Sequence, residues 1–380
     1  MNSKVTLLAA AGCLGAMVVL GQAPASQTGP GVQAPQDAKY AAFIAKNCKV
    51  PPTQARGGGA GRGSGSAAGR GGGAGRGSGG GRGSAADTGP EEYTVTAIPG
   101  IIAAGQKWKS VWTGTGNDAD GIMATKDGGI LAAQNTNSQV MKIDKDGKVT
   151  FPYTHTPTAG SIAMNKKGSL FVLERALPQA IEQLEPKRHI FANMINGEPL
   201  DCAGGLVNDM VAASNGGVYF TMGGVFYANP AGVITKQGTV AGTNGIVLSP
   251  NEKTLYVTGR ITPAPAGGGG GSMIAFDIKP DGSLTNERQY AMAGGDGSAV
   301  DSQGRLYATG GPGLPGGKPA LSVIGTDGKI IGQIPIPRPF ITVVFSGKDK
   351  KTLYGVFNNQ RQDEIFSIQM IAQGYKGRSK

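Results

Sequence analysis

The stretch "TNGIVLSPNEKTLYVTG", residues 243–259, has the pattern of a short apolar strand, a tight polar turn and a second strand with alternating apolar residues. Five other stretches have the same form: "ATKDGGILAAQ" (124–134), "MNKKGSLFVLE" (164–174), "ASNGGVYFTM" (213–222), "DSQGRLYATG" (301–310) and "GKDKKTLYGVF" (347–357). The six turns are centred near Asp127, Lys167, Asn215, Asn251, Gln303 and Asp349, at intervals of 40, 48, 36, 52 and 46 residues. A second hairpin, such as "KIDKDGKV" or "DIKPDGSL", lies between successive repeats. Four strands in about 45 residues is the period of a β-propeller blade. The sequence therefore predicts an all-β, six-bladed propeller over residues 91–380.

The end of the chain indicates how such a ring closes. After the last repeat only "DEIFSIQMI", residues 363–371, remains, so the sixth blade lacks an outer strand. We expect residues 91–113 to supply that strand, because an open blade would expose an unpaired edge. Trp108 and Trp112 in or beside this segment are then packing residues rather than ligand platforms. The alternative fold is a β-sandwich with insertions, against which the six equivalent hairpins argue.

The N-terminus has the features of a secretory signal peptide. Lys4 precedes the apolar run "VTLLAAAGCLGAMVVLG", which is followed by "APA" ending at Ala25. We expect residues 1–25 to be removed and the protein to be exported to the periplasm or the extracellular space, without a transmembrane helix in the mature chain. The alternative is a lipid anchor on Cys13, in "AAGC".

Residues 26–55 form a short segment containing Cys48, and residues 56–90 form a Gly/Arg/Ser-rich linker with no apolar side chain larger than alanine in its repetitive part, 56–84. Such a composition predicts a disordered tether. Its five arginines (Arg56, Arg62, Arg70, Arg76 and Arg82) supply much of the formal net charge of +11. An arginine-glycine tract also suits an anionic partner, but export and the lack of aromatic residues favour a spacer, and no nucleic acid is expected. Cys48 and Cys202 remain after cleavage, and the sequence leaves open whether they pair.

A ring of polar residues is predicted where the inner strands begin. Seven residues before the six turns stand Asp120, Gly160, Asn208, Asn244, Asp296 and Thr342. Equivalent positions of the blades converge at one mouth of the central channel. Oxygen donors from Asp120, Asn208, Asn244 and Asp296 suit a hard divalent cation, Ca²⁺ first, with Mg²⁺, Mn²⁺ or Zn²⁺ open. Asn, Asp and Gly are also ordinary turn formers, so the argument depends on the shared offset.

Three signatures in order resemble a known family. "VNDMVAASNGGVYFT" (207–221), "TNGIVLSPNEKTLYVT" (243–258) and "GGDGSAVDSQGRLYATG" (294–310) are similar to those of the senescence marker protein, gluconolactonase and luciferin-regenerating enzyme group (SMP-30/gluconolactonase/LRE-like), over about residues 95–370. The resemblance implies a six-bladed propeller with one divalent metal and, in many members, hydrolysis of lactones or related esters. It implies metal ligation by Asn244 and Asp296, a catalytic base at Asp296, and contact of Asn208 with the substrate or a metal-bound water.

The chain departs from the family pattern at two positions. Asp120 stands where the family usually has a glutamate in an E-G-P context, and Met222 stands where it often has an acidic residue. These departures affect the expected lactonase activity more than the metal site. Glu174 and Arg175 are candidates for contact with a hydroxylated ligand, although a surface ion pair is the simpler interpretation.

Three kinds of function therefore remain open. The first is an exported, metal-dependent lactonase or esterase acting on a small lactone or sugar-acid-like substrate. The second is a non-catalytic propeller that binds a ligand or partner, with a structural ion. An interaction protein that binds through its Arg/Gly tract is a further alternative.

Overall fold

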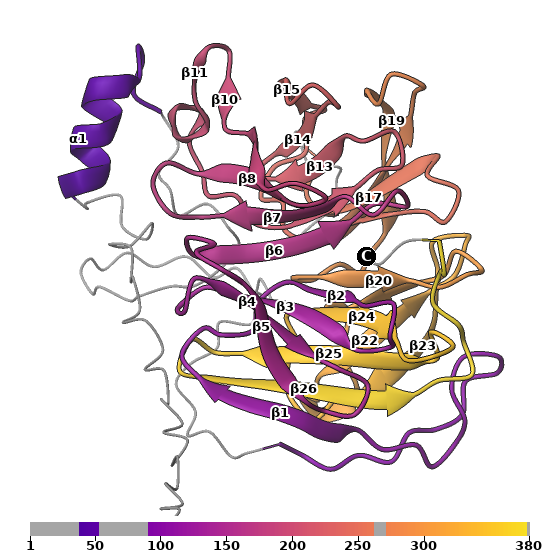
Figure 1. Cartoon of the computed structure of the whole chain (residues 1–380). Coiled ribbons are helices and arrows are strands. Elements are labelled where there is room, and N and C mark those ends of the chain that lie inside the picture. The colour runs from indigo at the N-terminus through magenta and orange to yellow at the C-terminus, as the bar shows by residue number, and fades with distance from the viewer. Residues whose placement is uncertain (1–37, 53–89, 262–270, 378–380) are drawn as a thin grey trace, which may run out of the picture.

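The computed structural model describes residues 38–52, 90–261 and 271–377 (Figure 1). The expected signal peptide, the alternative lipid site at Cys13 and the Arg/Gly tract at 56–84 lie outside these residues. In the described part of the chain, no helix is long and apolar enough to cross a membrane.

Six four-stranded antiparallel sheets form the blades of a β-propeller, as the repeats predict. The first blade contains β2 (Ile122–Ala124), β3 (Ile130–Gln134), β4 (Gln139–Ile143) and β5 (Val149–Thr154), and the second contains β6 (Ala159–Met164), β7 (Leu170–Glu174), β8 (Ala180–Glu185) and β9 (His189–Ala192). The third contains β12 (Met210–Ala212), β13 (Val218–Thr221), β14 (Val225–Ala228) and β15 (Ile234–Gln237). The fourth contains β16 (Ile246–Leu248), β17 (Thr254–Gly259), β18 (Ser272–Ile278) and β19 (Leu284–Ala291). The fifth contains β20 (Ser298–Val300), β21 (Leu306–Ala308), β22 (Ala320–Ile324) and β23 (Ile330–Pro335).

The sixth blade closes the ring in the predicted way. Its chain-terminal strands β24 (Thr342–Ser346), β25 (Thr352–Asn358) and β26 (Gln362–Gln369) are completed by β1 (Lys109–Thr115), which pairs antiparallel with β26. Figure 1 shows β1, from the start of the domain, beside β26, from its end. The prediction of residues 91–113 as the source of this strand is confirmed, although the strand extends two residues further. Contacts of β24 with both β20 and β2 complete the circle of inner strands.

The core lies between neighbouring blades. The inner strands β2, β12, β16 and β20 are buried along their whole length, whereas the outer strand β5 is mostly exposed. One cluster joins Phe171 of the second blade to Phe220 of the third, and another joins Tyr307 of the fifth to Phe345 of the sixth. This two-sided packing explains the short, continuous apolar runs that follow each polar turn-forming residue.

Both tryptophans are packing residues, as expected. Trp108 lies edge-on to Phe340, with ring centroids 4.9 Å apart, and its indole N–H donates to the Pro335 carbonyl at 2.8 Å. Trp112 packs against the core shared by the first and sixth blades. These contacts fix the segment that leads into β1 and thereby support ring closure.

Five elements of the described residues lie outside the blades. They are the helix α1 (Ala38–Asn47), the hairpin of β10 (Met194–Ile195) and β11 (Glu198–Pro199), and the short 3-10 helices η1 (Leu200–Ala203) and η2 (Pro315–Gly317). A disulfide joins Cys48, just after α1, to Cys202 in η1. The pairing that the sequence left open is thus made in the structure.

Candidate active site

All six residues of the predicted ring line one cavity. The lining consists of Asp120, Gly121, Gly160, Asn208, Asp209, Asn244, Asp296, Gly297, Ile341 and Thr342, around an empty volume of about 240 Å³ that is partly open to solvent. Each of the six blades contributes at the start of its inner strand, because the repeats keep the same offset. The predicted site residues Asp120, Asn208, Asn244 and Asp296 are therefore brought together.

Small residues after the polar positions let the inner strands approach one another. A Cβ atom at Gly245 would lie 2.6 Å from the Asp296 carbonyl oxygen, and one at Gly297 would lie 2.6 Å from Thr342 Oγ1. Real Cβ atoms do not come this close to other atoms, so these positions need glycine for the approach of neighbouring blades. The convergence of the preceding Asn244 and Asp296 side chains depends on this approach.

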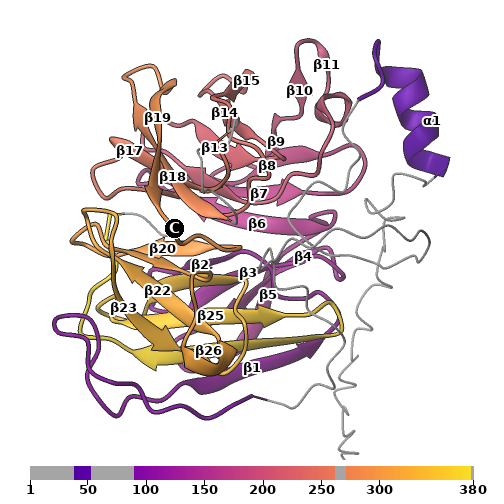
Figure 2. The same ribbon diagram turned by 180° about the vertical axis from the view of Figure 1, so that it is seen from behind.

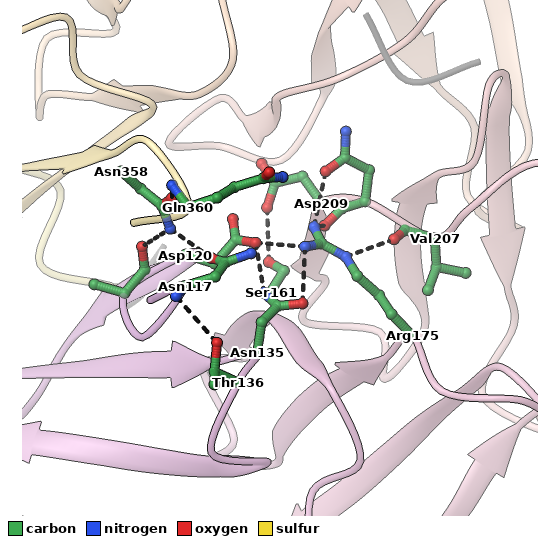
Figure 3. A network of polar contacts seen from close by, with 12 residues as sticks. Asn117, Asp120, Asn135, Thr136, Ser161, Arg175, Val207, Asp209, Asn358 and Gln360 are labelled. Carbon is green, nitrogen blue, oxygen red and sulfur yellow. Dashed lines mark hydrogen bonds and ion pairs between the residues drawn. The ribbon is translucent and has the colours of Figure 1, made fainter. Parts of the chain in front are cut away.

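Arg175 enters the site from the loop between β7 and β8. Its guanidinium is buried, forms an ion pair with Asp120, and donates from Nε to the Val207 carbonyl at 2.9 Å. Nη1 also donates to Asn135 Oδ1 at 3.4 Å, and Nη2 donates to both the carbonyl and Oδ1 of Asn208 at 2.9 Å. Figure 3 shows the contacts of Arg175 with Asp120, Asn135 and Val207. The five N–H groups of the guanidinium are all engaged, so Arg175 holds other residues in place.

The interpretation of Glu174 and Arg175 as a surface ion pair is wrong. Both residues are buried, and the partner of Arg175 is Asp120. Side chains alternate along a strand, and Glu174 lies instead near Glu182. Burial, and secondly the Glu182 carboxylate, raise the pKa of Glu174 to about 8.

Arg175 also determines how Asn208 is oriented. Because Asn208 Oδ1 accepts from the guanidinium, its Nδ2 is directed to Asn244 and donates to Asn244 Oδ1 at 2.6 Å. A carboxamide whose oxygen faces a cation donor must present its N–H₂ group elsewhere. Asn208 therefore meets Asn244 through a donor nitrogen.

Asp209 is a site residue that the sequence reasoning missed. Its carboxylate lines the cavity and accepts hydrogen bonds from Ser161 Oγ at 2.7 Å, from Met210 N at 2.9 Å and from Ile246 N at 3.1 Å. These donors belong to the second, third and fourth blades, so one carboxylate ties three inner strands together. The available signal was the adjacent Asn-Asp pair, in which only the asparagine matched the repeat offset.

The loop that carries Asp120 is fixed from two sides. Asn135 Nδ2 donates to Asp120 Oδ2 at 2.7 Å, and Asn358 Nδ2 donates to the Ala119 carbonyl at 2.9 Å. Asp363 of β26 accepts from the backbone N–H groups of Asp118 and Ala119. Burial raises the pKa of Asp363 to about 7. The closing blade thus helps to position Asp120 (Figure 3).

The chemistry of these donors fits a hard divalent cation. Three carboxylates, on Asp120, Asp209 and Asp296, line the cavity, and Asp120 forms an ion pair with Arg175. Thr342 Oγ1 lines the same cavity, is buried and has no hydrogen-bond partner among the described residues. Those residues contain no cluster of three or more His, Cys, Asp or Glu side chains suited to a metal. The available donors are therefore mixed carboxylate and carboxamide oxygens, which Ca²⁺ accepts.

Comparisons with known proteins agree with this fold. The model of the SMP-30/Gluconolactonase/LRE-like region matches residues 156–356. Lactonase drp35 of Staphylococcus aureus strain USA300 is 26% identical over 271 residues, which cover 65% of this chain and 76% of that protein. A gluconolactonase structure from Xanthomonas campestris has a TM-score of 0.58 at 20% identity, covering 74% of this chain and 97% of its own. A calcium-binding regucalcin structure from Agrobacterium tumefaciens has a TM-score of 0.50 at 14% identity, covering 70% of this chain and 96% of its own. With more than half of its length matched by the family model and the family's three signatures arranged around one cavity, the chain belongs to the SMP-30/Gluconolactonase/LRE-like family.

Proposed function

We propose that this protein is an exported, metal-dependent hydrolase that opens a lactone or a related ester by attack of water. The observation that carries this proposal is the convergence of Asp120, Asn208, Asn244 and Asp296 on one cavity. Membership of a family with relatives named lactonases supports the substrate class. The carboxylate and carboxamide oxygens that line the cavity support a hard divalent cation as the cofactor.

Asp120, Asn244 and Asp296 would hold the cation, with Asn208 adjacent through a water molecule. Asn208 takes this place because its uncharged carboxamide oxygen accepts from the cationic Arg175. The Asn244 oxygen accepts instead from a neutral amide, and the Asp120 carboxylate carries a charge of its own. A bound divalent cation supplies polarisation of the ester carbonyl and stabilisation of negative charge on its oxygen. Ca²⁺ is the first candidate because the donors are hard oxygens, and the calcium-binding protein of the same fold supports that choice.

Side chains of the site would orient the attacking water and accept its proton. Asp296 accepts a proton from the water that attacks the carbonyl carbon, and the Asn208 Nδ2 group orients that water or a substrate hydroxyl. The ring C–O bond of the lactone breaks, and the leaving oxygen takes up a proton to give a hydroxy acid. Arg175 keeps Asp120 and Asn208 in place during this reaction, because all its donors are already engaged by them and their neighbours.

Export has independent support in the Cys48–Cys202 disulfide. Disulfides persist in oxidising compartments and are rare in the cytosol. The disulfide is therefore consistent with the signal-peptide interpretation of residues 1–25.

A lactone panel assayed with and without a chelator tests the proposal. The full chain is purified, its metal content is measured, and hydrolysis of γ-, δ- and sugar-acid lactones is followed by acid release. We expect turnover of at least one lactone class, loss with EDTA and recovery with Ca²⁺ or Mn²⁺. Absence of turnover with every lactone in the metal-loaded protein would contradict the enzymatic proposal.

A ligand-binding propeller without turnover is the second candidate. The observation that favours it is the ion pair between Asp120 and Arg175, which partly neutralises the carboxylate where the family usually has a longer glutamate. In that case the metal-loaded protein binds a lactone or hydroxy acid in calorimetry but leaves it unchanged. The same panel therefore distinguishes the two candidates.

A further inference from the structure

The loop that delivers Asn208 to the cavity has little regular structure of its own. It follows η1 and contains two consecutive glycines with positive φ, Gly204 at 75° and Gly205 at 85°. Glycine adopts this conformation at a larger loss of chain entropy than other residues. The loop therefore depends on contacts with other segments to keep Asn208 in place.

Gln179 provides two of these contacts. It is fully buried on the loop between β7 and β8, the same loop that carries Arg175. Its Oε1 accepts the Val207 N–H at 2.8 Å, and its Nε2 donates to the Gly205 carbonyl at 3.3 Å. Val207 in turn accepts from Arg175 Nε. Gln179 thus holds Val207, which precedes Asn208 in the chain and also accepts a hydrogen bond from Arg175.

Asp201 orients Gln179. This carboxylate is fully buried in η1 and accepts from the backbone N–H of Gln179 at 2.9 Å and from its Nε2 at 3.2 Å. A buried carboxylate without such partners would be strongly destabilising. The position of η1 is therefore coupled to that of Gln179.

The next residue in η1, Cys202, is covalently joined to the N-terminal helix. The Cα atoms of Cys48 and Cys202 lie 5.4 Å apart. Tyr40 and Ile44, one turn apart on α1, are buried, and Lys49 N donates to the Glu198 carboxylate. Figure 2 shows α1 beside the β10–β11 hairpin, as Figure 1 does from the opposite side. Helix α1 contacts η1 directly.

We propose that Gln179 and Asp201 are positioning residues for Asn208 and Arg175, and that the Cys48–Cys202 disulfide fixes this framework from outside the propeller. Opening the disulfide loosens η1, which frees Asp201, Gln179 and then the loop 204–208. The site is therefore sensitive to reduction although neither cysteine lines the cavity. The role of Asn208 in turnover rests on the proposed function, whereas the coupling of the loop to the disulfide does not.

A disulfide that acts only on global stability would behave differently. A cross-link over 154 residues stabilises the folded protein by restricting the unfolded chain. Its loss would therefore speed up amide hydrogen exchange in every segment whose amides exchange through global unfolding. A positioning role instead changes the loop 204–208 and spares the far side of the cavity. Hydrogen exchange followed by mass spectrometry separates the two effects, because it reports opening segment by segment.

The experiment compares the oxidised full chain, the full chain treated with a phosphine reductant, and the variant Gln179→Ala with its disulfide intact. Gln183→Ala is the matched control, because Gln183 lies on the adjacent strand and donates only to the Lys187 carbonyl. We expect at least tenfold faster exchange in 204–209 for the reduced chain and for Gln179→Ala, with residues 296–300 unchanged. Gln183→Ala should exchange as the wild type does.

Unchanged exchange of 204–209 in Gln179→Ala, or in the reduced chain with free thiols verified by mass, overturns the proposal. If reduction unfolds the whole chain, Gln179→Ala decides alone, since its disulfide remains. Where a lactone is hydrolysed, Gln179→Ala should lower kcat at least tenfold with a smaller change in KM. A chain that hydrolyses no lactone but gives the expected exchange pattern contradicts the proposed function and leaves this inference standing.

Discussion

The guanidinium of Arg175 occupies the space that a side chain at Gly160 would need. A Cβ atom at position 160 would lie 2.2 Å from Arg175 Nε and 2.4 Å from its Cζ. Gly160 is the one member of the polar ring without a side chain, and its absence of a Cβ lets Arg175 reach Asp120 and Asn208 across the cavity wall. The ring is thus completed by a residue from outside the repeat position.

Gly160→Ala should displace Arg175 and break its ion pair with Asp120. We expect a loss of about 3 kcal/mol in the free energy of unfolding, because overpacking and an uncompensated buried charge add. Denaturant unfolding measures this loss. A double-mutant cycle provides the control. In an Arg175→Ala background the space beside position 160 is empty, so Gly160→Ala should lower the free energy of unfolding by less than about 0.5 kcal/mol. Equal losses in both backgrounds would show that Arg175 does not need the glycine.

The fold and the ring were predictable from sequence because both depend on a repeat. Six turns at similar intervals specify six blades, and a constant offset from each turn places Asp120, Asn244 and Asp296 at the same height around one channel. Arg175 was misread because it belongs to the β7–β8 loop, which has no fixed offset from the turns. The position of Arg175 depends on the absence of a Cβ at Gly160 in the same blade and on acceptors outside that blade, such as Asp120 and the Val207 carbonyl.

For similar reasons, two other features of the structure could not be predicted from the sequence. Asp209 alternates away from Asn208 along the chain, and only the three-dimensional packing shows that its carboxylate joins three blades. The Cys48–Cys202 pair is separated by 154 residues, including the linker whose composition gives no distance. A sequence distance of this size leaves the spatial distance undetermined.

Removal of the metal should destabilise the protein, and Ca²⁺ should restore it. Three carboxylates line one cavity, and like charges that are brought together raise the free energy of the folded state unless a cation compensates them. A ligand at about a hundred times its Kd adds about 2.7 kcal/mol by mass action. We therefore expect EDTA to lower Tm by about 5–10 °C, measured by calorimetry with and without added Ca²⁺.

Substitutions should localise that metal site. Asp296→Ala removes both a proposed ligand and the proposed base, so it should abolish calcium binding in titration calorimetry. Asn208→Ala should retain much of the affinity and lose turnover, because the Asn208 oxygen is engaged by Arg175. Asp327→Ala, in the exposed turn between β22 and β23 and not among the residues that line the cavity, is the control. The assignment fails if Asp296→Ala and Asp327→Ala bind Ca²⁺ equally.

Loss of β1 should open the ring. A chain that starts at residue 116 lacks Lys109–Thr115 and exposes the backbone edge of β26. We expect its Tm to fall by about 10 °C or more and light scattering to report aggregation. A chain that starts at residue 90 keeps β1 and lacks residues 1–89, which include α1 and Cys48, so it is the control for loss of the N-terminal segment. Equal melting of the two truncated chains would contradict closure through β1.

Glu174 should make stability decrease as the pH rises. Burial, and secondly the Glu182 carboxylate, raise its pKa from the ordinary value of 4.5 to about 8 in the folded chain. Below pH 4.5 both states hold the proton; between 4.5 and 8 the unfolded state releases it first, so the free energy of unfolding decreases through that window. Glu174→Gln keeps a neutral side chain of the same size and should flatten the curve, so that its free energy of unfolding decreases less than that of the wild type as the pH rises toward 8. Denaturant unfolding from pH 5 to 9 measures the difference from wild type, and Glu92→Gln, with an exposed side chain, controls for the lost charge. If the Glu174→Gln and wild-type curves stay parallel across this range, Glu174 is already ionised in the folded protein.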